Sequence, residues 1–148
     1  MKSQFELSAG GVVFRKRGEA SEILLIKDSY GKWSLPKGHV AMKEREPVES
    51  AALREIREET GIDKLKVVAK LDEIKYLFKL KGKLIFKKVV FYLVESLHEK
   101  EKINFQKKEI QGAEWFDPEQ AQAKIGYKNT LKIIRKAIKI IKNVKRKM

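Results

Sequence analysis

The chain has 148 residues, 43% of them hydrophobic, no cysteine, and a formal net charge of +14 at pH 7. This length and apolar content favour one globular domain over residues 1–148 and exclude global disorder, while the missing cysteines exclude disulfides, thiolate zinc sites and a cysteine nucleophile. Because no run of about 18 apolar residues occurs and the start lacks a long apolar segment behind a basic one, we expect a cytoplasmic protein without a membrane span.

The N-terminal part of the chain favours short strands separated by turns. Strands are expected at residues 4–15, 22–27 and 33–35. A turn at Arg17-Gly18 separates the first two, and Pro36 ends the third. Residues 37–46 predict a loop.

A helix is expected next, at about residues 47–60. Pro47 suits a first helical position, and Gly61 suits the left-handed position just past the helix end. Leu53 and Ile56 face away from a stripe of glutamates, so this helix can bury one side and present the other.

The second half of the chain continues with strands and ends in a helix. Strands are expected within 65–76, at 84–95 and at 113–116, with a hairpin turn at Lys81-Gly82, a loop over 97–108, a small helix from Asp117-Pro118 and a long helix at 129–144. Leu131, Ile134, Ile138 and Ile141 form the apolar stripe of the last helix. Strands with helices between them predict an α/β or α+β fold, with helices on both faces of a mixed sheet.

Three acidic residues crowd the last turns of the predicted first helix. Glu55, Glu58 and Glu59 share one stripe at 3.6 residues per turn. Like charges at this spacing repel, and anions near a helix C-terminus meet the negative end of its dipole. A positive partner is therefore expected. Arg54 and Arg57 supply part of it, and a divalent cation with oxygen ligands would supply the rest.

The stretch KGHVAMKEREPVESAALREIREETGI, residues 37–62, resembles the signature of the Nudix hydrolases, G-x5-E-x7-R-E-U-x-E-E-x-G-U, where U is a bulky aliphatic residue. Arg54 to Ile62 fit its second half without a mismatch, and seven residues separate Glu46 from Arg54, as in the motif. Gly38, however, lies two residues too far from Glu46. Glu44 keeps the glycine spacing but misses the arginine spacing. We favour Glu46, because a loop absorbs two extra residues more easily than a helix face does.

The resemblance extends beyond this box. The segments SAGGVVF (8–14), WSLPKG (33–38) and EWFDP (114–118) are similar to other Nudix landmarks, in the same order. The family implies an α/β/α sandwich around a mixed central sheet. Within it, the chain looks most like the small hydrolases of dinucleoside polyphosphates. Those enzymes cleave diadenosine tetraphosphate asymmetrically into ATP and AMP.

The resemblance also implies roles for individual residues. It implies Mg²⁺ as cofactor, with Mn²⁺ as a substitute, bound by Glu55, Glu58, Glu59 and the backbone carbonyl of Gly38. Glu55 is the favoured holder of the attacking water, and Arg54 is expected to orient a glutamate. Some members use a glutamate outside the box, and here the candidate base and metal ligand is Glu109, with Glu95 and Glu114 as weaker alternatives.

Candidate substrate contacts come from cationic and aromatic residues. Lys37, beside Gly38, and Lys87, on a predicted central strand, could bind phosphate. Tyr76 and Tyr127 are candidates for stacking on a base, with Phe78 as a further one. Trp33 and Trp115 are expected to be structural.

Several alternatives remain open on sequence grounds. Relatives in the family act on nucleoside triphosphates, oxidised nucleotides or RNA 5′ ends, and the basic charge leaves RNA as a partner. Residues 131–148 hold eight lysines and arginines and no acid, so a non-catalytic, basic RNA-binding module is a second class of function. The oligomeric state is left open.

Overall fold

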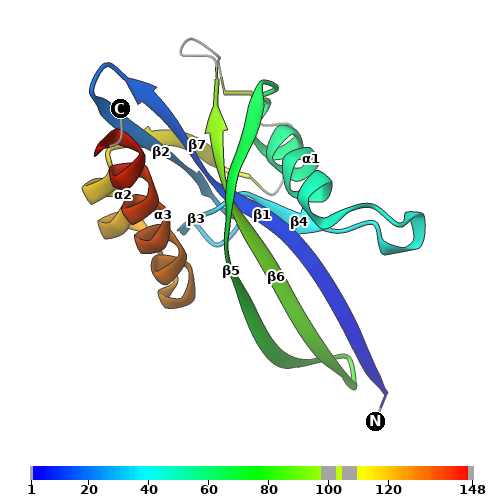
Figure 1. Ribbon diagram of the computed structural model, residues 1–148. Coiled ribbons are helices and arrows are strands. Elements are labelled where there is room, and N and C mark those ends of the chain that lie inside the picture. The colour runs from blue at the N-terminus through cyan, green and yellow to red at the C-terminus, as the bar shows by residue number, and fades with distance from the viewer. Residues whose placement is uncertain (1, 98–102, 105–109, 147–148) are drawn as a thin grey trace.

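The computed structural model describes residues 2–97, 103–104 and 110–146. Within them, seven strands form one sheet flanked by three α-helices and a 3-10 turn (Figure 1). The strands are β1 (Ser3–Arg17), β2 (Ala20–Lys27), β3 (Trp33–Ser34), β4 (Lys37–His39), β5 (Leu65–Leu80), β6 (Lys83–Ser96) and β7 (Gly112–Phe116). The helices are α1 (Val48–Thr60), α2 (Pro118–Lys124) and α3 (Lys128–Arg146), with the 3-10 turn η1 at Met42–Glu44.

The sheet is mixed. Its main path runs β3-β2-β1-β6-β5, while β4 pairs with β1 and β7 pairs with β2 off this path. The β1–β6 pair is parallel, from Ser3 opposite Leu84 to Phe14 opposite Glu95. The other pairs are antiparallel. The short strand β4 pairs with β1 and also contacts α1, so the three elements lie next to one another.

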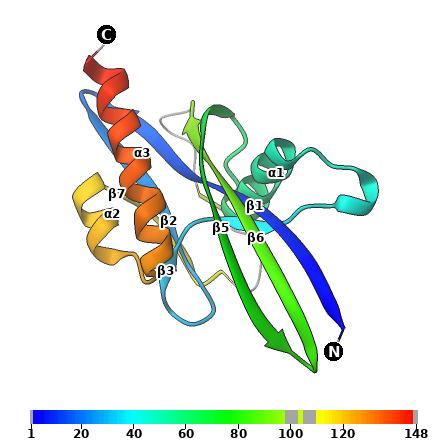
Figure 2. The ribbon, with the colours of Figure 1, turned by 60° about the horizontal axis from the view of Figure 1, so that its bottom comes forward.

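Helices cover both faces of the sheet. Helix α1 lies on one face of the sheet, and α2 and α3 lie on the other. Figures 1 and 2 show this arrangement from two directions. Ile134 and Ile138 of α3 are 0% and 6% exposed and pack in one cluster with Val12 and Phe91 of the sheet. Ile56 of α1 packs with strand residues on the opposite face. The α/β/α sandwich is confirmed.

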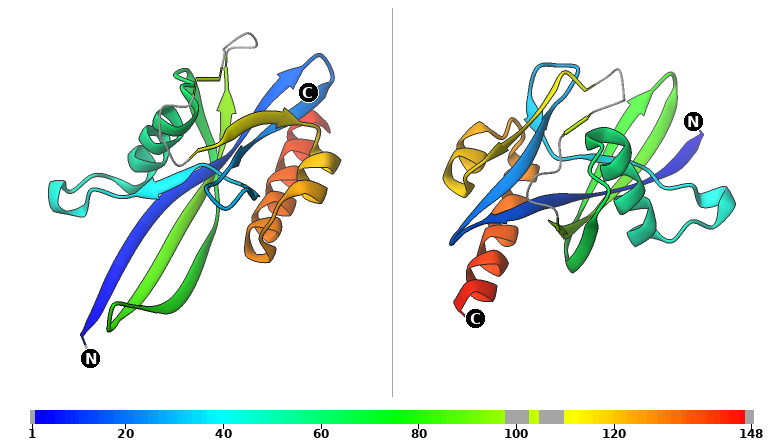
Figure 3. Two further views of the ribbon diagram at one scale, coloured as in Figure 1. Left: turned by 180° about the vertical axis from the view of Figure 1, so that it is seen from behind. Right: turned by 90° about the horizontal axis from the view of Figure 1, so that it is seen from above.

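Side-chain alternation along β1 explains the two clusters. Val12 lies in the α3-side cluster and Val13 in the α1-side cluster, because successive strand residues point to opposite faces. Both residues are 0% exposed, and β1 is buried on both sides from Ser8 to Phe14. Its first half projects with β5 and β6 beyond the helices (Figure 3).

Three sequence-based assignments differ from the structure, the second of them by one residue. Residues 37–39 are strand β4 rather than loop, because their backbone pairs with Ser8, Ala9 and Gly10. Helix α1 begins at Val48; Pro47 is extended (φ −62°, ψ 141°) and caps it. Strand β5 continues past Tyr76 to Leu80, because each of its last residues pairs with a residue of β6.

The other boundaries agree within a few residues. The hairpin turn after β5 has both its residues, Lys81 and Gly82, at positive φ, which is the form that a tight two-residue turn favours. The predicted loop at 97–108 falls mostly outside the described residues. No helix in the described ranges is long and apolar enough to span a bilayer.

Candidate functional site

Arg54 is the centre of a hydrogen-bond network at the start of the last two turns of α1. Its Nε and Nη2 donate to the two carboxylate oxygens of Glu46 at 2.7 and 2.9 Å. Its Nη1 donates to Glu55 at 2.9 Å and to Glu58 at 3.2 Å, and Nη2 also reaches the carbonyl of His39 at 2.9 Å. One planar guanidinium therefore fixes three carboxylates relative to one another and to β4.

Glu46 is held on both sides. Besides the two bonds from Arg54, it accepts the backbone N–H of Ala41 at 3.0 Å. These hydrogen bonds, the one from Arg54 above all, lower the pKa of Glu46 to about 2. Reciprocally, the bonds to Glu46 first, then those to Glu55 and Glu58, raise the pKa of Arg54. The pair is ionised throughout the neutral range.

The loop before α1 takes up the extra length that the sequence shows after Gly38. Residues Met42–Glu44 form a 3-10 turn, and Arg45 follows in the left-handed conformation with φ 57°. The chain thereby folds back, so that Glu46 rather than Glu44 meets Arg54. This geometry supports the alignment in which the loop carries the insertion.

Glu55 lies against the backbone of Gly38. Its side chain is nearly buried, and a Cβ added to Gly38 would come within 2.0 Å of Glu55 Oε2. Only a residue without a side chain therefore fits at this point of β4 while the Glu55 carboxylate keeps this position. The glycine lets the Glu55 carboxylate come close to the backbone of β4. The family resemblance implies that Glu55 and the Gly38 carbonyl bind one metal ion together, which requires this closeness.

Glu59 of α1 is held by Lys37, the residue before Gly38 in β4. Its Oε1 accepts the backbone N–H of Lys37 at 2.7 Å, and the residue is 5% exposed. A second glycine allows this arrangement, because a Cβ at Gly10 of β1 would lie 2.2 Å from the carbonyl of Pro36. Strands β1 and β4 and helix α1 can thus pack closely enough to bury two carboxylates.

The donor chemistry suits a hard divalent cation. Glu55, Glu58 and Glu59 offer only oxygen atoms, and Gly38 places backbone beside them; Mg²⁺ prefers such ligands. Within the described residues, however, no three His, Cys, Asp or Glu side chains converge as a ready-made metal site. Arg54 Nη1 instead occupies the position between Glu55 and Glu58. Glu109, the candidate outside the box, lies outside the described residues.

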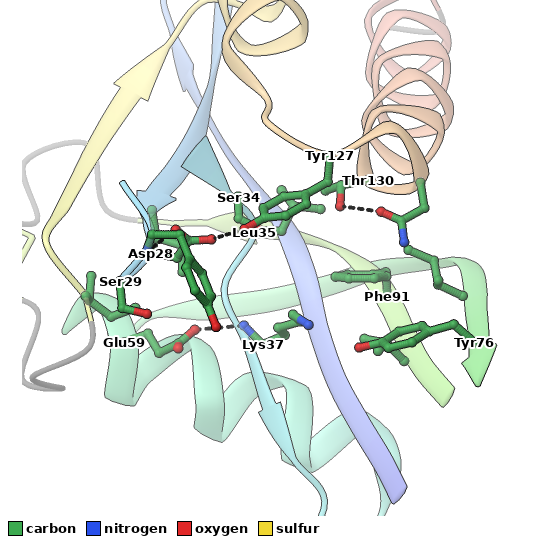
Figure 4. A pocket seen from close by; sticks show the side chains of 16 residues that line it. Asp28, Ser29, Ser34, Leu35, Lys37, Glu59, Tyr76, Phe91, Tyr127 and Thr130 are labelled. Atoms are coloured by element: carbon green, nitrogen blue, oxygen red, sulfur yellow. Dashed lines mark hydrogen bonds between the residues drawn. The ribbon is translucent and has the colours of Figure 1, made fainter. Parts of the chain in front are cut away.

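A pocket of about 460 Å³ adjoins these carboxylates at Glu59, which lines it (Figure 4). Strand residues Tyr76 and Phe91, Tyr127 from the segment before α3, and Lys37 with Glu59 all line it. Three of the four predicted substrate contacts, Lys37, Tyr76 and Tyr127, therefore lie in one cavity with a box glutamate. The remaining lining residues include Asp28, Ser29, Ser34, Leu35, Val89 and Thr130.

Lys87, the fourth predicted contact, lies beside this pocket and does not line it. It lies on the same face of β6 as the lining residues Val89 and Phe91, because the three positions are two residues apart, and its Nζ pairs with Glu6 at 3.5 Å. Burial, and next the positive charge of Lys87, lower the pKa of Lys37. The two cations therefore lie near each other on the pocket side of the sheet, as an anion-binding pair would.

Asp28 is a pocket residue that the sequence did not single out. Its side chain accepts the N–H groups of Tyr30 and Lys32 at 3.0 Å each, and the hydroxyl of Tyr127 at 2.5 Å. The hydrogen bond to Asp28 is also the main cause that raises the pKa of Tyr127 to about 12. An aspartate at the start of a Ser-Tyr-Gly-Lys turn was the available signal, since aspartate often caps such turns.

The other aromatic candidates take different positions. Phe78 stacks on Tyr76, with ring centroids 5.9 Å apart, outside the pocket lining. Trp33 packs edge-on against Phe116 at 5.1 Å, and Arg15 lies over Trp115 at 4.3 Å. Both tryptophans thus have structural contacts, as predicted.

The comparisons with known proteins agree with this geometry. A Mycobacterium tuberculosis protein (strain CDC 1551 / Oshkosh) named MutT4 is 36% identical over 104 residues, which is 66% of this chain but 41% of the relative's length. The chain therefore spans less than half of that protein.

Two solved structures share the fold. A C. elegans Ap4A hydrolase in a binary complex superposes with a TM-score of 0.75 at 27% identity, covering 93% of this chain and 98% of that one. The NUDIX domain of Shewanella oneidensis NrtR, complexed with ADP ribose, gives a TM-score of 0.73 at 18% identity, covering 95% and 90%. The second shows the fold alone.

The NUDIX domain family matches residues 4–137, from the first strand through most of α3. The match includes the carboxylate network, both glycine contacts and the pocket. Taken with the sandwich architecture, it establishes that this chain belongs to the Nudix hydrolase family.

Proposed function

We propose that this chain is a metal-dependent pyrophosphohydrolase that cleaves diadenosine tetraphosphate asymmetrically into ATP and AMP. The observation that supports this most is the position of Glu59, which belongs to the box carboxylates and also lines the aromatic pocket. A nucleoside held in that pocket would have its phosphate chain directed toward Glu55 and Glu58. The site thus combines a base-binding and a charge-binding part.

On the carboxylate side, Glu55, Glu58, Glu59 and the Gly38 carbonyl would bind Mg²⁺, with Mn²⁺ as a substitute. The bound cation would neutralise the phosphate oxygens and acidify a water. Glu55, fixed by Arg54 and Gly38, would take the proton of the attacking water. The water oxygen then bonds to phosphorus, the anhydride P–O bond breaks, and its electron pair leaves with the departing phosphate.

On the pocket side, the roles follow from chemistry and position. Tyr76, Phe91 and Tyr127 offer faces on which an adenine ring can stack. Lys37 and Lys87 would attract the phosphates; their mutual repulsion would fall when an anion comes between them. A dinucleoside polyphosphate needs both features, which favours it over inorganic pyrophosphate.

The likeness to the C. elegans Ap4A hydrolase supports this substrate class, since it covers nearly all of both chains. The basic surface makes RNA 5′ ends the second candidate, followed by nucleoside triphosphates. The single domain and the cytoplasmic location stay predictions.

The test is a substrate panel in ¹⁸O-labelled water with Mg²⁺ present. Diadenosine tetraphosphate should yield ATP and AMP, with the label in one product only. Glu58→Gln should lose about 100-fold or more in kcat, while Glu44→Gln, on the 3-10 turn, should match the parent. Two equal ADP products would contradict the asymmetric cleavage. Release from 5′-triphosphorylated RNA alone would move the substrate to RNA ends.

A further inference from the structure

Helix α3 exposes a straight stripe of cations. Its members follow one another at spacings of four, three, four and three residues, which keeps them on one side of the helix. The stripe consists of Lys128, Lys132, Arg135, Lys139 and Lys142, all exposed. From first to last it extends about 21 Å, at 1.5 Å per residue.

Within the part of the chain that the structure describes, little neutralises this stripe. Residues 128–146 contain no acid, and in the described part of the chain the ion pair on α3 is made by Lys136, which meets Asp72 at 2.6 Å beside the stripe. Asp72 also feels the charge of Lys132. The remaining members present their charge to solvent, so the stripe is a field for an external polyanion.

The opposite, buried side of α3 argues against an anionic membrane as the partner of the stripe. Ile133, Ile134, Ala137, Ile138 and Ile141 are at most 6% exposed, because they pack on the sheet. A helix that lies on a membrane inserts its apolar face into the acyl boundary. Here that face is already buried, so α3 would have to detach from the core to do so.

The composition of the stripe distinguishes between nucleic acids. Proteins that bind single strands combine cations with aromatic side chains for base stacking, and residues 128–146 contain no aromatic residue. Duplexes carry one phosphate per about 1.7 Å of axis, twice the density of one strand, and bind through charge alone. We infer that the exposed face of α3 binds the phosphate backbone of duplex nucleic acid without sequence preference.

This surface differs from the candidate hydrolytic site. The pocket takes its α3 contribution from Asn129 and Thr130 at the start of the helix, whereas the stripe runs along the outer side toward the C-terminus. Figure 2 shows α3 lying on one face of the sheet, and the stripe is on the helix side opposite the residues buried there. Loss of duplex binding would therefore leave kcat intact, and the two proposals can fail separately.

The experiment measures binding of the full chain to a fluorescent DNA duplex of about 12 base pairs with 5′-hydroxyl ends, by anisotropy, between about 50 and 200 mM KCl. Five phosphate contacts predict a slope of log K against log salt near about −4.5. The variant Arg135→Gln/Lys139→Gln, which keeps good helix formers, should reduce the slope to about −2.7.

Two matched variants complete the design. Lys79→Gln/Lys83→Gln removes the same charge from exposed ends of β5 and β6 and should keep the parent slope. Arg135→Lys/Lys139→Arg should keep it as well. Equal losses in the first control and the α3 variant, tighter binding to a single strand of the same length, or tighter binding to phosphatidylserine vesicles would each overturn the inference, as would no binding at the lowest salt.

Discussion

Arg54 determines how the box carboxylates are arranged, because every nitrogen of its guanidinium has a carboxylate partner. Such a residue acts through others. It holds Glu55 and Glu58 at fixed positions, and its tie to Glu46 prevents it from following them if they move toward a cation. Glu46, eight residues before Arg54, therefore anchors the guanidinium, while Glu55 and Glu58, after it, are the acids that the guanidinium positions.

We expect Arg54→Lys to lower kcat by about 10–100-fold, the range for residues that orient metal ligands. An ammonium cannot bond Glu46, Glu55 and Glu58 at once. The free energy of unfolding should fall by about 1–3 kcal/mol, since charged hydrogen bonds are lost. Enzyme assays and urea unfolding measure both. Arg57 is the control, because its Nε donates to the carbonyl of Asp63 at 3.2 Å on the surface. Arg57→Lys should change neither kcat nor stability, and an effect equal to that of Arg54→Lys would refute the positioning role of Arg54.

Glu46 should make the stability of the protein depend on acid pH. Its pKa of about 2 lies below the ordinary 4.5, so its contribution is present above pH 4.5 and is lost as the pH falls toward 2. Glu46→Gln should therefore cost about 1–2 kcal/mol at pH 7, and this gap should narrow by about half at pH 3. Urea unfolding at the two pH values checks it, with Glu44→Gln as control; a gap that is constant with pH would contradict the pairing.

At the scale of elements, the contact of β4 with α1 depends on Gly38. An alanine there would place its Cβ 2.0 Å from Glu55 Oε2, so the Glu55 carboxylate must move out of its present position between Gly38 and Arg54. We expect Gly38→Ala to cost about 1–3 kcal/mol of stability and about 100-fold in kcat, as misplacements near 1 Å do. Gly112→Ala in β7 has its nearest neighbour, Lys27 Cβ, at 3.7 Å and should be nearly neutral. Comparable losses in both variants would show that Gly38 has no special role.

Helix α1 and the strand pair β5–β6 were predictable because their signals are local. Gly61 has φ 76° and its N–H bonds the carbonyl of Arg57, as a glycine past a helix end predicts. Strand β4 was missed because its three residues have no alternation of their own and are fixed by pairing with Ser8–Gly10. Pairing between distant segments leaves little trace in either segment.

In the candidate site too, contacts within one element could be predicted from the sequence, and contacts between distant segments could not. The carboxylates follow one another on a single helix, so their proximity could be inferred from spacing alone. The contact of Tyr127 with Asp28 joins residues 99 positions apart, and no periodicity reports it. Similarly, the backbone N–H of Lys37 binds Glu59, a contact that the sequence does not report, because it shows side-chain types but not where the backbone points.

At the scale of the whole molecule, charge is strongly uneven. Six glutamates and three arginines lie between residues 44 and 59, within a chain whose net charge is +14. Such a field concentrates anions around the protein, while the local acids keep a place for a cation. The stripe on α3 and the pair Lys37–Lys87 lie on the same side of the sheet as the pocket, so their fields add along the approach of an anionic substrate.

This field predicts a salt dependence of catalysis. For a tetraphosphate substrate, kcat/KM should fall about tenfold between about 0.05 and 0.3 M KCl, because screening shortens the range over which the basic surface attracts it. The change should appear in KM, since bound phosphates are shielded from salt and kcat stays nearly constant. Steady-state kinetics at fixed Mg²⁺ would show this. The variant Arg135→Gln/Lys139→Gln should flatten the dependence more than Lys79→Gln/Lys83→Gln. If kcat fell in parallel while KM held, salt would be acting on the chemical step, and the surrounding charge would have no part in substrate capture.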